Sequence, residues 1–218
     1  IMSFAPLGVF CLIGKFVIAD GLDIFQDVVA YVVLLISLLL FHAAFTYSFF
    51  LKAIGGLNPL TFFRKMKDVA LFAFSTSSSA ATIPVTLRTA NQDLGVNQNV
   101  ASFVVPVGAT INMDGTAIMQ GLATVFIAQM SGIDLTLFQY VQVVLLAVAT
   151  SIGTAAVPSA GTITLIIILQ QFNLPLEAIG IILAVDRVLD MIRTSVNVTG
   201  DAAIACIVAK TENQLDEN

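Results

Sequence analysis

Long apolar runs alternate with short polar connections along the chain. Residues 1–19 and 28–51 are apolar runs of about the 20-residue length that a membrane-crossing helix needs. Aspartates mark the connection 20–27 between them, whereas lysines and an arginine mark the connection 52–67 that follows. Because basic connections favour the cytoplasmic side of a membrane, the pattern places 52–67 in the cytoplasm and 20–27 outside.

Two later apolar segments are interrupted by small and hydroxyl-bearing residues. Segment 69–90 carries Ser75–Pro84 at its centre, and segment 135–172 carries Ser151–Gly161. Five successive hydroxyl side chains followed by a proline are expected to break a helix. Such backbone persists at membrane depth only when it is buried in protein or lines a wet cavity. The pattern favours two re-entrant helical hairpins; a pair of kinked membrane helices with serine-rich packing faces is the alternative. Paired interruptions of this kind point to a transporter's binding site.

A third interruption lies between the two hairpins, where the apolar segment 101–130 contains Gly108–Thr116. Asn112, Asp114 and backbone carbonyls freed near the glycines are hard oxygen donors. Such donors, without cysteine or histidine, suit Na⁺, Mg²⁺ or Ca²⁺ rather than zinc or copper.

Polar residues form one stripe on the last apolar span, 178–209. Successive spacings of 4, 3, 4 and 4 place five of them within an arc of about 80° on a helix. They are Asp186, Asp190, Arg193, Asn197 and Asp201. Asp190 and Arg193 are spaced for an ion pair. Each ionised group costs about 2.5–3.5 kcal/mol at the centre of a membrane helix, so the stripe must face polar surroundings. Three aspartates outnumber one arginine there, even if Arg187 on the flank helps, which favours a cation site over an ion-pair network that only joins helices.

The composition excludes several classes of protein. Of the 218 residues, 58% are hydrophobic and 11% charged, against about 25% charged in soluble domains, so the bilayer is the expected solvent. A net charge of −5 offers no basic footprint for nucleic acid. Cys11 and Cys206 are expected to be buried small apolar residues, and His42, the single histidine, is not expected to build a metal site or a catalytic triad. An aspartyl protease using Asp114 and Asp190 is disfavoured, because Arg193 would keep one carboxylate ionised.

Four motifs, in this order, resemble the dicarboxylate/amino acid:cation symporter family, which includes the archaeal aspartate transporters and the excitatory amino acid transporters. They are Ser77–Ser79, Asn112–Thr116, Ser151–Gly161 and Asp190–Asp201. The resemblance implies an all-α polytopic membrane protein with two re-entrant helical hairpins and broken helices, as in the glutamate-transporter fold. It also implies that the chain begins near the family's fifth transmembrane helix, with four earlier helices absent, including the third, which contributes to one sodium site.

The expected organisation is a scaffold helix, a transport domain and a polar tail. The scaffold helix is 1–24, the transport domain 25–210 and the tail 211–218. Within the transport domain we expect a helix at 25–52, hairpin one at 60–92, a broken helix at 98–130, hairpin two at 135–173 and the last helix at 177–209.

The resemblance implies a substrate site for an acidic amino acid. Arg193, with help from Thr116, would hold the side-chain carboxylate, since a guanidinium fork suits a planar carboxylate. Asp190 would accept the ammonium group, and Asn197 would bind the α-carboxylate with Thr194 alongside. The hairpin tips would close the site. The implied substrate residues are Ser78, Ser79, Thr116, Val157, Gly161, Asp190, Arg193, Thr194 and Asn197.

The resemblance further implies sodium as the coupling ion and no cofactor. One sodium site would use Gly108, Asn112, Asn197 and Asp201. A second would use Thr110, Ser151, Ile152 and Thr154, and a third Asn112 and Asp114 with the third helix. Gln120 stands where proton-coupled animal relatives have a glutamate, which favours sodium alone.

Several positions depart from the family's pattern. Ser77 stands where archaeal relatives have an arginine, and Met191 where animal relatives have one; Arg187 is a candidate replacement. Ala156 and Ser159 replace glycines at the second tip, which predicts a lid of different flexibility.

The sequence thus predicts a sodium-coupled symporter of aspartate or glutamate, and not an enzyme, working by alternating access. We expect a multi-pass protein of the cell (inner or plasma) membrane that contacts lipid, forms a homotrimer and binds no nucleic acid. Protons are an alternative coupling ion. A C4-dicarboxylate symporter and an ion channel are the alternative functions.

Overall fold

A computed structural model describes Phe10, Cys11, Gly14, Ile18 and residues 24–216. Within these residues the fold is all-helical, with one isolated antiparallel bridge between Val96 and Leu215. The all-α prediction is therefore confirmed for the described part of the chain. The predicted scaffold helix 1–24 lies outside the described residues, apart from a few isolated positions.

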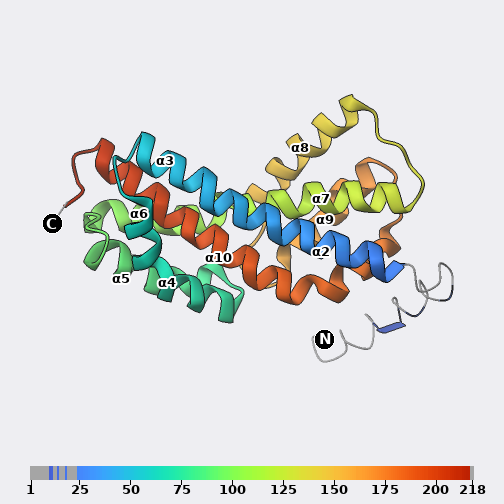
Figure 1. The fold of residues 1–218 in the computed structure, drawn as a ribbon, viewed down its shortest axis with the longest axis horizontal. Coiled ribbons are helices and arrows are strands. Elements are labelled where there is room, and N and C mark those ends of the chain that lie inside the picture. The colour runs from blue at the N-terminus through green and yellow to red at the C-terminus, as the bar shows by residue number, and fades with distance from the viewer. Residues whose placement is uncertain (1–9, 12–13, 15–17, 19–23, 217–218) are drawn as a thin grey trace.

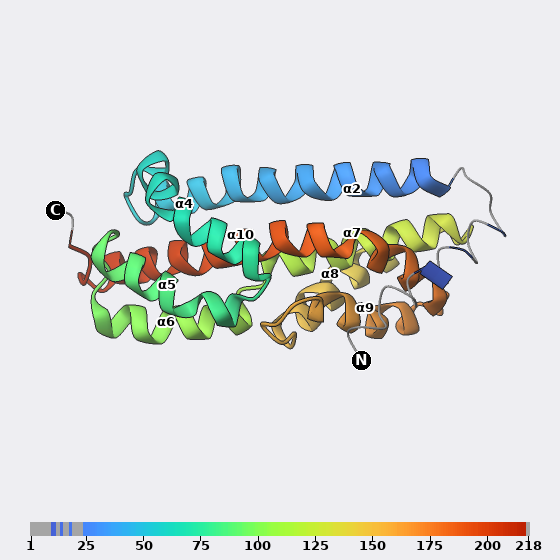
Figure 2. The ribbon, with the colours of Figure 1, turned by 90° about the horizontal axis from the view of Figure 1, so that it is seen from below.

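The helices follow one another with short connections (Figures 1 and 2). Their bounds are α2 (Ile24–Phe41), a π-helix (His42–Tyr47), α3 (Ser48–Ala53), α4 (Pro59–Thr76), α5 (Ser79–Gln92), α6 (Gln98–Ile111), α7 (Asp114–Met130), α8 (Leu137–Ile152), α9 (Ala160–Gln171), a 3₁₀ turn (Leu176–Ala178) and α10 (Ile179–Thr211).

Helix α10 is the central element of the molecule. It runs along the long axis, with α4, α5 and α6 gathered towards the end that carries the C-terminus and α7, α8 and α9 towards the other (Figures 1 and 2). Two hydrophobic cores lie along it. Leu35, Met119, Leu165 and Leu189 belong to one core. Met66, Val69, Val105 and Cys206 belong to the other. Polar residues in the middle of α10 therefore lie where the two halves of the molecule meet.

The first interrupted segment folds as two helices, α4 and α5, that pack against each other. Ser77 ends α4 in a left-handed conformation, with φ of 50°. Ser78 begins α5, because its hydroxyl accepts a hydrogen bond from the backbone N–H of Ala81 at 3.2 Å. The predicted break is confirmed at Ser77 and Ser78, but Pro84 takes no part in it, because it lies inside α5. The hydroxyl of Ser75 instead donates to a carbonyl of its own helix, which keeps it compatible with α4.

The second interrupted segment also contains two packed helices, α8 and α9. Helix α8 begins with a capping box formed by Thr136 and Gln139, and it ends at Ile152. The connection then runs to Ser159, whose φ of 59° places a residue other than glycine in the left-handed region, and α9 starts at Ala160.

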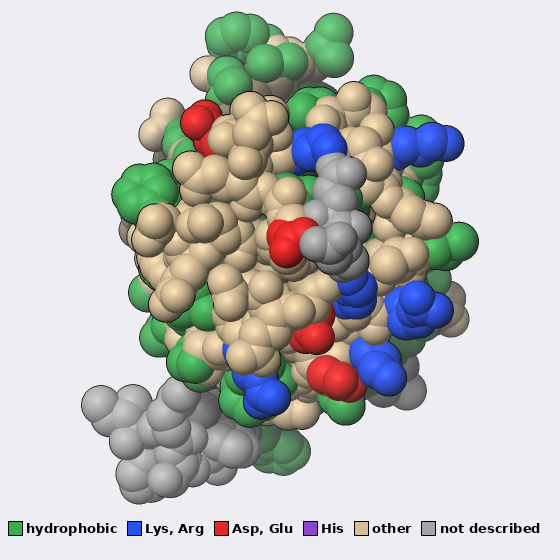
Figure 3. Space-filling view, turned by 90° about the vertical axis from the view of Figure 1, so that its left-hand side faces the viewer, with side chains coloured by type: hydrophobic (Ala, Val, Ile, Leu, Met, Phe, Trp, Pro, Cys, Tyr) green, Lys and Arg blue, Asp and Glu red, His purple; other side chains and the backbone are tan. Residues whose placement is uncertain are grey.

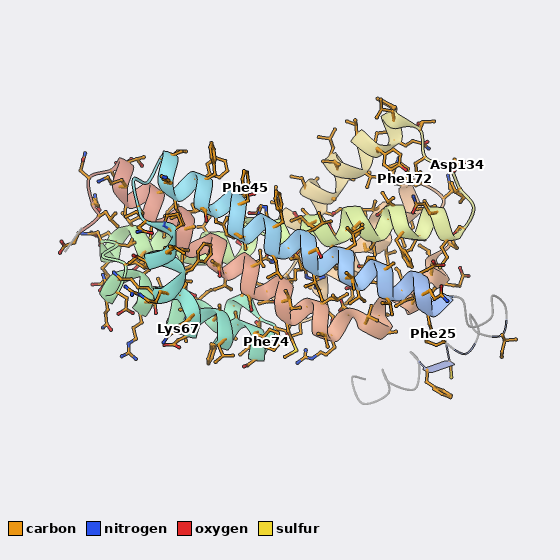
Figure 4. The ribbon with its side chains drawn as sticks, in the orientation of Figure 1. Phe25, Phe45, Lys67, Phe74, Asp134 and Phe172 are labelled. Carbon is orange, nitrogen blue, oxygen red and sulfur yellow. The ribbon has the colours of Figure 1, made fainter. Side chains whose placement is uncertain are left out.

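Many large apolar side chains are exposed on the surface of the described residues. One helical stretch among the described residues, Phe25–Ala53, is long and apolar enough to cross a membrane, with a mean hydropathy of 2.6 and 17% of its most apolar window buried. Phe25, at the start of this stretch, and Phe45, further along it, project outward and are 48% and 63% exposed (Figure 4). At the end of the molecule that carries the C-terminus, lysine and arginine side chains lie among aspartate and glutamate side chains (Figure 3). An apolar flank of this kind is compatible with a helix that crosses a membrane.

Candidate functional site

The break between α6 and α7 exposes backbone groups in the centre of the molecule. Asn112 and Met113 have non-helical backbone angles, with ψ of 74° and 51°. The first N–H groups of α7 consequently need partners from elsewhere. Asn197 of α10 supplies one, because its side-chain oxygen accepts a hydrogen bond from the N–H of Gly115 at 2.8 Å. Its amide nitrogen lies 3.3 Å from the hydroxyl oxygen of Thr116. Asn197 thus links the start of α7 to the centre of α10 by hydrogen bonds.

Arg193 is held between two carboxylates of its own helix. It forms an ion pair with Asp190, as predicted, and its guanidinium lies 3.7 Å from Asp186. All three residues are buried, at 2 to 3% exposure. Asp186 also accepts a hydrogen bond from the hydroxyl of Thr162 in α9 at 2.6 Å. A guanidinium beside two buried carboxylates leaves one negative charge in excess, so the centre favours a further positive group.

The tips of both helix pairs meet at this centre. The backbone N–H of Ser159 donates to Asp190 at 2.9 Å. The Ser78 hydroxyl donates to the carbonyl of Ala156 at 2.8 Å, and the Ala80 N–H donates to the same carbonyl at 3.3 Å. The tip between α8 and α9 therefore contacts the buried Asp190, and the two tips touch each other.

A cavity of about 20 Å³ lies between the tips, α7 and α10. Every predicted substrate residue except Ser78 lines it, namely Ser79, Thr116, Val157, Gly161, Asp190, Arg193, Thr194 and Asn197. This volume admits about one water molecule, whereas ligand pockets usually exceed about 300 Å³. A ligand much larger than a water molecule therefore fits only if the residues around this cavity move. Ser78 contributes at the tip-to-tip contact instead.

The residues of the first predicted sodium site also lie together. The amide nitrogen of Asn112 lies 3.0 Å from Asp201 and 3.5 Å from the carbonyl of Asn197. Gly108 packs directly over Asp201, because an added Cβ would lie 2.7 Å from that carboxylate. Asp201 is only 2% exposed, and Asn112 is its hydrogen-bond partner. A buried carboxylate satisfied by one amide is electrostatically suited to a small cation.

The second predicted sodium set is only partly brought together. Ser151 and Ile152 line a cavity of about 390 Å³ that also reaches Asn112 and Asp114. Thr154 lines the small cavity of the substrate residues instead. Thr110 lines neither cavity; it is exposed, and its hydroxyl donates to the carbonyl of Val107 at 2.9 Å.

Sequence reasoning missed two residues that contact Asp114. His42 Nε2 and the Tyr47 hydroxyl lie 3.2 Å and 3.3 Å from the same oxygen, Asp114 Oδ2. His42 was not expected to form a site, because no cysteine or acidic cluster surrounds it in sequence. The contact joins positions 72 residues apart and depends on the π-helix, for which we recognise no signal in the sequence.

Gln120 of α7 forms hydrogen bonds with both α8 and α9. Its amide nitrogen donates to the carbonyl of Gly161 at 3.0 Å and lies 2.7 Å from the hydroxyl of Thr164. Its oxygen accepts from the hydroxyl of Thr150 on α8 at 2.7 Å. Arg187, in contrast, is exposed on the outside of α10 and does not line the small cavity, so its placement does not support a role as the replacement arginine.

Helices broken at buried charges, with two tips closing over them, define the class of a membrane carrier rather than that of an enzyme. Residues 1–211 match the model of the sodium:dicarboxylate symporter family, and the chain belongs to that family. The family resemblance predicted from four motifs is confirmed. The members it resembles are transporters and not enzymes.

Three animal transporters are among the proteins that this chain resembles. An excitatory amino acid transporter of Caenorhabditis elegans is 43% identical over 210 residues, which cover 95% of this chain and 42% of that protein. Excitatory amino acid transporter 2 of Homo sapiens is 43% identical over 95% of this chain and 37% of its own length. Excitatory amino acid transporter 3 of Mus musculus is 42% identical over 96% of this chain and 40% of its own. The chain thus spans about two fifths of the length of these relatives.

Proposed function

We propose that this chain forms the substrate- and ion-binding part of a secondary-active symporter that moves aspartate or glutamate with sodium. The observation that carries the proposal is the buried Arg193, placed between two carboxylates where both helix tips and the α7 break converge. A guanidinium fork binds a carboxylate with two parallel hydrogen bonds. Asp190, beside it, suits an ammonium group.

Substrate binding exchanges one set of ion pairs for another. The side-chain carboxylate of the amino acid takes the place of Asp190 on Arg193, and the freed Asp190 pairs with the α-ammonium group. The α-carboxylate then lies between Asn197 and Thr194. No charged group of the protein is left unpaired by this exchange, which matters because an uncompensated buried charge costs about 3–5 kcal/mol. Succinate would leave Asp190 without a partner, so an amino acid is favoured over a simple dicarboxylate.

Sodium binding accounts for the remaining negative groups. Asp201 is buried against Asn112, and Asp114 begins α7 beside the same break. Carbonyl, amide and carboxylate oxygens are the donors that sodium uses at broken helices in transporters. Cations bound there would hold Asn112 and Met113 in the conformation that Asn197 and Thr116 need for substrate.

Alternating access is the mechanism that fits these contacts. In this proposal, 60–92 and 135–173 are re-entrant hairpins of a mobile transport domain, 25–210, which moves past a scaffold that includes 1–24. The protein is a homotrimer in the cell membrane, with the apolar flank of α2 against lipid or scaffold. Coupling requires that sodium and amino acid both favour the closed conformation, since a ligand with equal affinity for two conformations shifts neither.

Uptake of labelled aspartate into proteoliposomes tests the proposal with the full-length protein. We expect saturable uptake that depends on an inward sodium gradient. Uptake that ignores the gradient would remove the coupling, and flux that does not saturate would favour a channel.

Isothermal titration decides the substrate class. Aspartate, glutamate and succinate are titrated at several sodium concentrations. We expect the two amino acids to bind more tightly as sodium rises, and succinate to bind weakly throughout. Tight succinate binding would refute the role assigned to Asp190.

A further inference from the structure

The segment that follows α2 is a π-helix, His42–Tyr47, and it places two side chains on one oxygen. Residues five apart point about 140° away from each other on an α-helix, at 100° per residue. A π-helix, with its i→i+5 hydrogen bonds, stacks such residues on one side. His42 and Tyr47 consequently both reach Asp114 Oδ2, and their rings pack edge to face with centroids 4.8 Å apart.

The Tyr47 hydroxyl joins three helices. It lies 3.3 Å from Asp114 Oδ2 at the start of α7 and 3.3 Å from the carbonyl of Val196 on α10. Since a hydroxyl has one donor and two acceptor positions, it can donate to either oxygen. Tyr47 is 5% exposed, so water does not readily replace the hydroxyl. The contact fixes the distance between the start of α7 and the polar stripe of α10.

Gly200 makes this approach possible. A Cβ added there would lie 2.6 Å from the Tyr47 hydroxyl oxygen and 2.6 Å from the amide nitrogen of Asn112. Tyr47 therefore lies in the same small space as the residue that holds Asp201. Hydrogen bonds from His42 and Tyr47 engage only Oδ2, and in the described part of the chain no hydrogen bond reaches Asp114 Oδ1. That second oxygen stays free to bind a cation.

We propose that Tyr47 is a positioning residue for the sodium-binding carboxylate of Asp114, so that helix α2 helps to set the sodium affinity of this transporter. The inference rests on the proposed function, in which Asp114 binds sodium. Tyr47 does not contact the ion itself; it holds Oδ2 so that Oδ1 faces the break between α6 and α7. The π-helix places the Tyr47 hydroxyl at this position.

Tyr47→Phe tests the inference in the full-length protein, because it removes the hydroxyl and keeps the ring against His42. Aspartate uptake is measured as a function of sodium concentration. We expect the sodium concentration for half-maximal uptake to rise about fivefold. Loss of a fully buried hydrogen bond to a charged group would raise it about tenfold or more. The smaller effect is expected because 39% of the Asp114 side chain is exposed. The KM for aspartate and the maximal rate at saturating sodium should stay within about twofold, since Tyr47 does not line the substrate cavity.

Tyr31→Phe is the matched control, because Tyr31 lies buried on the same helical segment and its hydroxyl has no hydrogen-bond partner among the residues that the structure describes. Its sodium dependence should match wild type. An unchanged sodium dependence in Tyr47→Phe, or an equal shift in both variants, would overturn the inference and leave the proposed transport intact. Sodium-independent uptake by the wild type would instead refute the proposed function.

Gly200→Ala provides a second variant if Tyr47→Phe does not fold. Its methyl group displaces the Tyr47 hydroxyl from the opposite side. We expect the same direction of change in sodium dependence, at least fivefold, because Asn112 is displaced as well. Wild-type sodium dependence in Gly200→Ala would contradict the inference.

Discussion

Replacing Gly161 with alanine tests whether the second helix tip must close tightly over the substrate site. Gly161 lies in the first turn of α9, against α7 and α10. An added Cβ would lie 2.7 Å from Thr116 Cγ2, 3.3 Å from Met119 Cε and 3.4 Å from Arg193 Cζ. The first distance is shorter than van der Waals contact allows, so α9 or Thr116 must shift. In the proposed alternating-access mechanism, this crowding is expected in the closed conformation and not in the open one.

The size of the effect follows from two opposing contributions. An extra methyl group in a packed site costs about 1–3 kcal/mol. Alanine is better than glycine in a helix by about 1 kcal/mol, but this gain applies equally to the open and the closed conformation. This gain therefore changes the free energy of unfolding but not the equilibrium between the open and the closed conformation. If the added methyl group destabilises only the closed conformation, by about 1–2 kcal/mol, we expect aspartate affinity to fall about 5- to 30-fold.

The assay is isothermal titration of aspartate at saturating sodium, combined with a thermal unfolding measurement without aspartate. Gly161→Ala should bind aspartate more weakly, while its melting temperature without aspartate should not fall. Gly153→Ala, at the end of α8 near the same tip, is the matched control, because its nearest neighbour would be the Thr150 carbonyl oxygen at an ordinary 3.8 Å and its φ is −88°. Wild-type affinity in Gly161→Ala would refute the idea that this tip closes against Thr116 when substrate is bound.

Three further substitutions address the charges and the tip contact. Arg193→Cys should lower aspartate affinity at least tenfold in titration, since a hydrogen bond to a charge contributes about 1.5–3 kcal/mol. The control variant Arg187→Cys, at an exposed position, should leave aspartate affinity unchanged. Asp201→Asn should raise the sodium concentration for half-maximal uptake at least tenfold; an unchanged sodium dependence would remove Asp201 from the cation site. Ser78→Ala removes both the cap of α5 and the bond to the Ala156 carbonyl, so we expect about 1–2 kcal/mol lower stability and weaker aspartate binding, read by thermal unfolding and titration.

Local sequence patterns were sufficient where the physical cause is local. The hydroxyl run at Ser75–Ser79 predicted a break in an apolar segment, and the helix does end there, at Thr76. The same reasoning overestimated Pro84, because a helix can continue through a proline when the surrounding packing supports it. The spacing of Asp190 and Arg193 predicted their ion pair, since neighbours on one helix face are set by helical geometry alone.

The sequence by itself determined an all-helical membrane chain, the places where helices are interrupted and the polar stripe of α10, because each follows from the periodicity and hydrophobicity of neighbouring residues. Only the tertiary structure decided what these groups touch. The Ser78 hydroxyl meets a carbonyl 78 positions away, and Tyr47 meets Asp114 across 67 positions through a π-helix. Such contacts depend on how whole helices pack: even one added methyl group at Gly200 would lie 2.6 Å from the Tyr47 hydroxyl oxygen. Packing of that kind is set by the sum of many weak interactions across the molecule, and no local pattern encodes it.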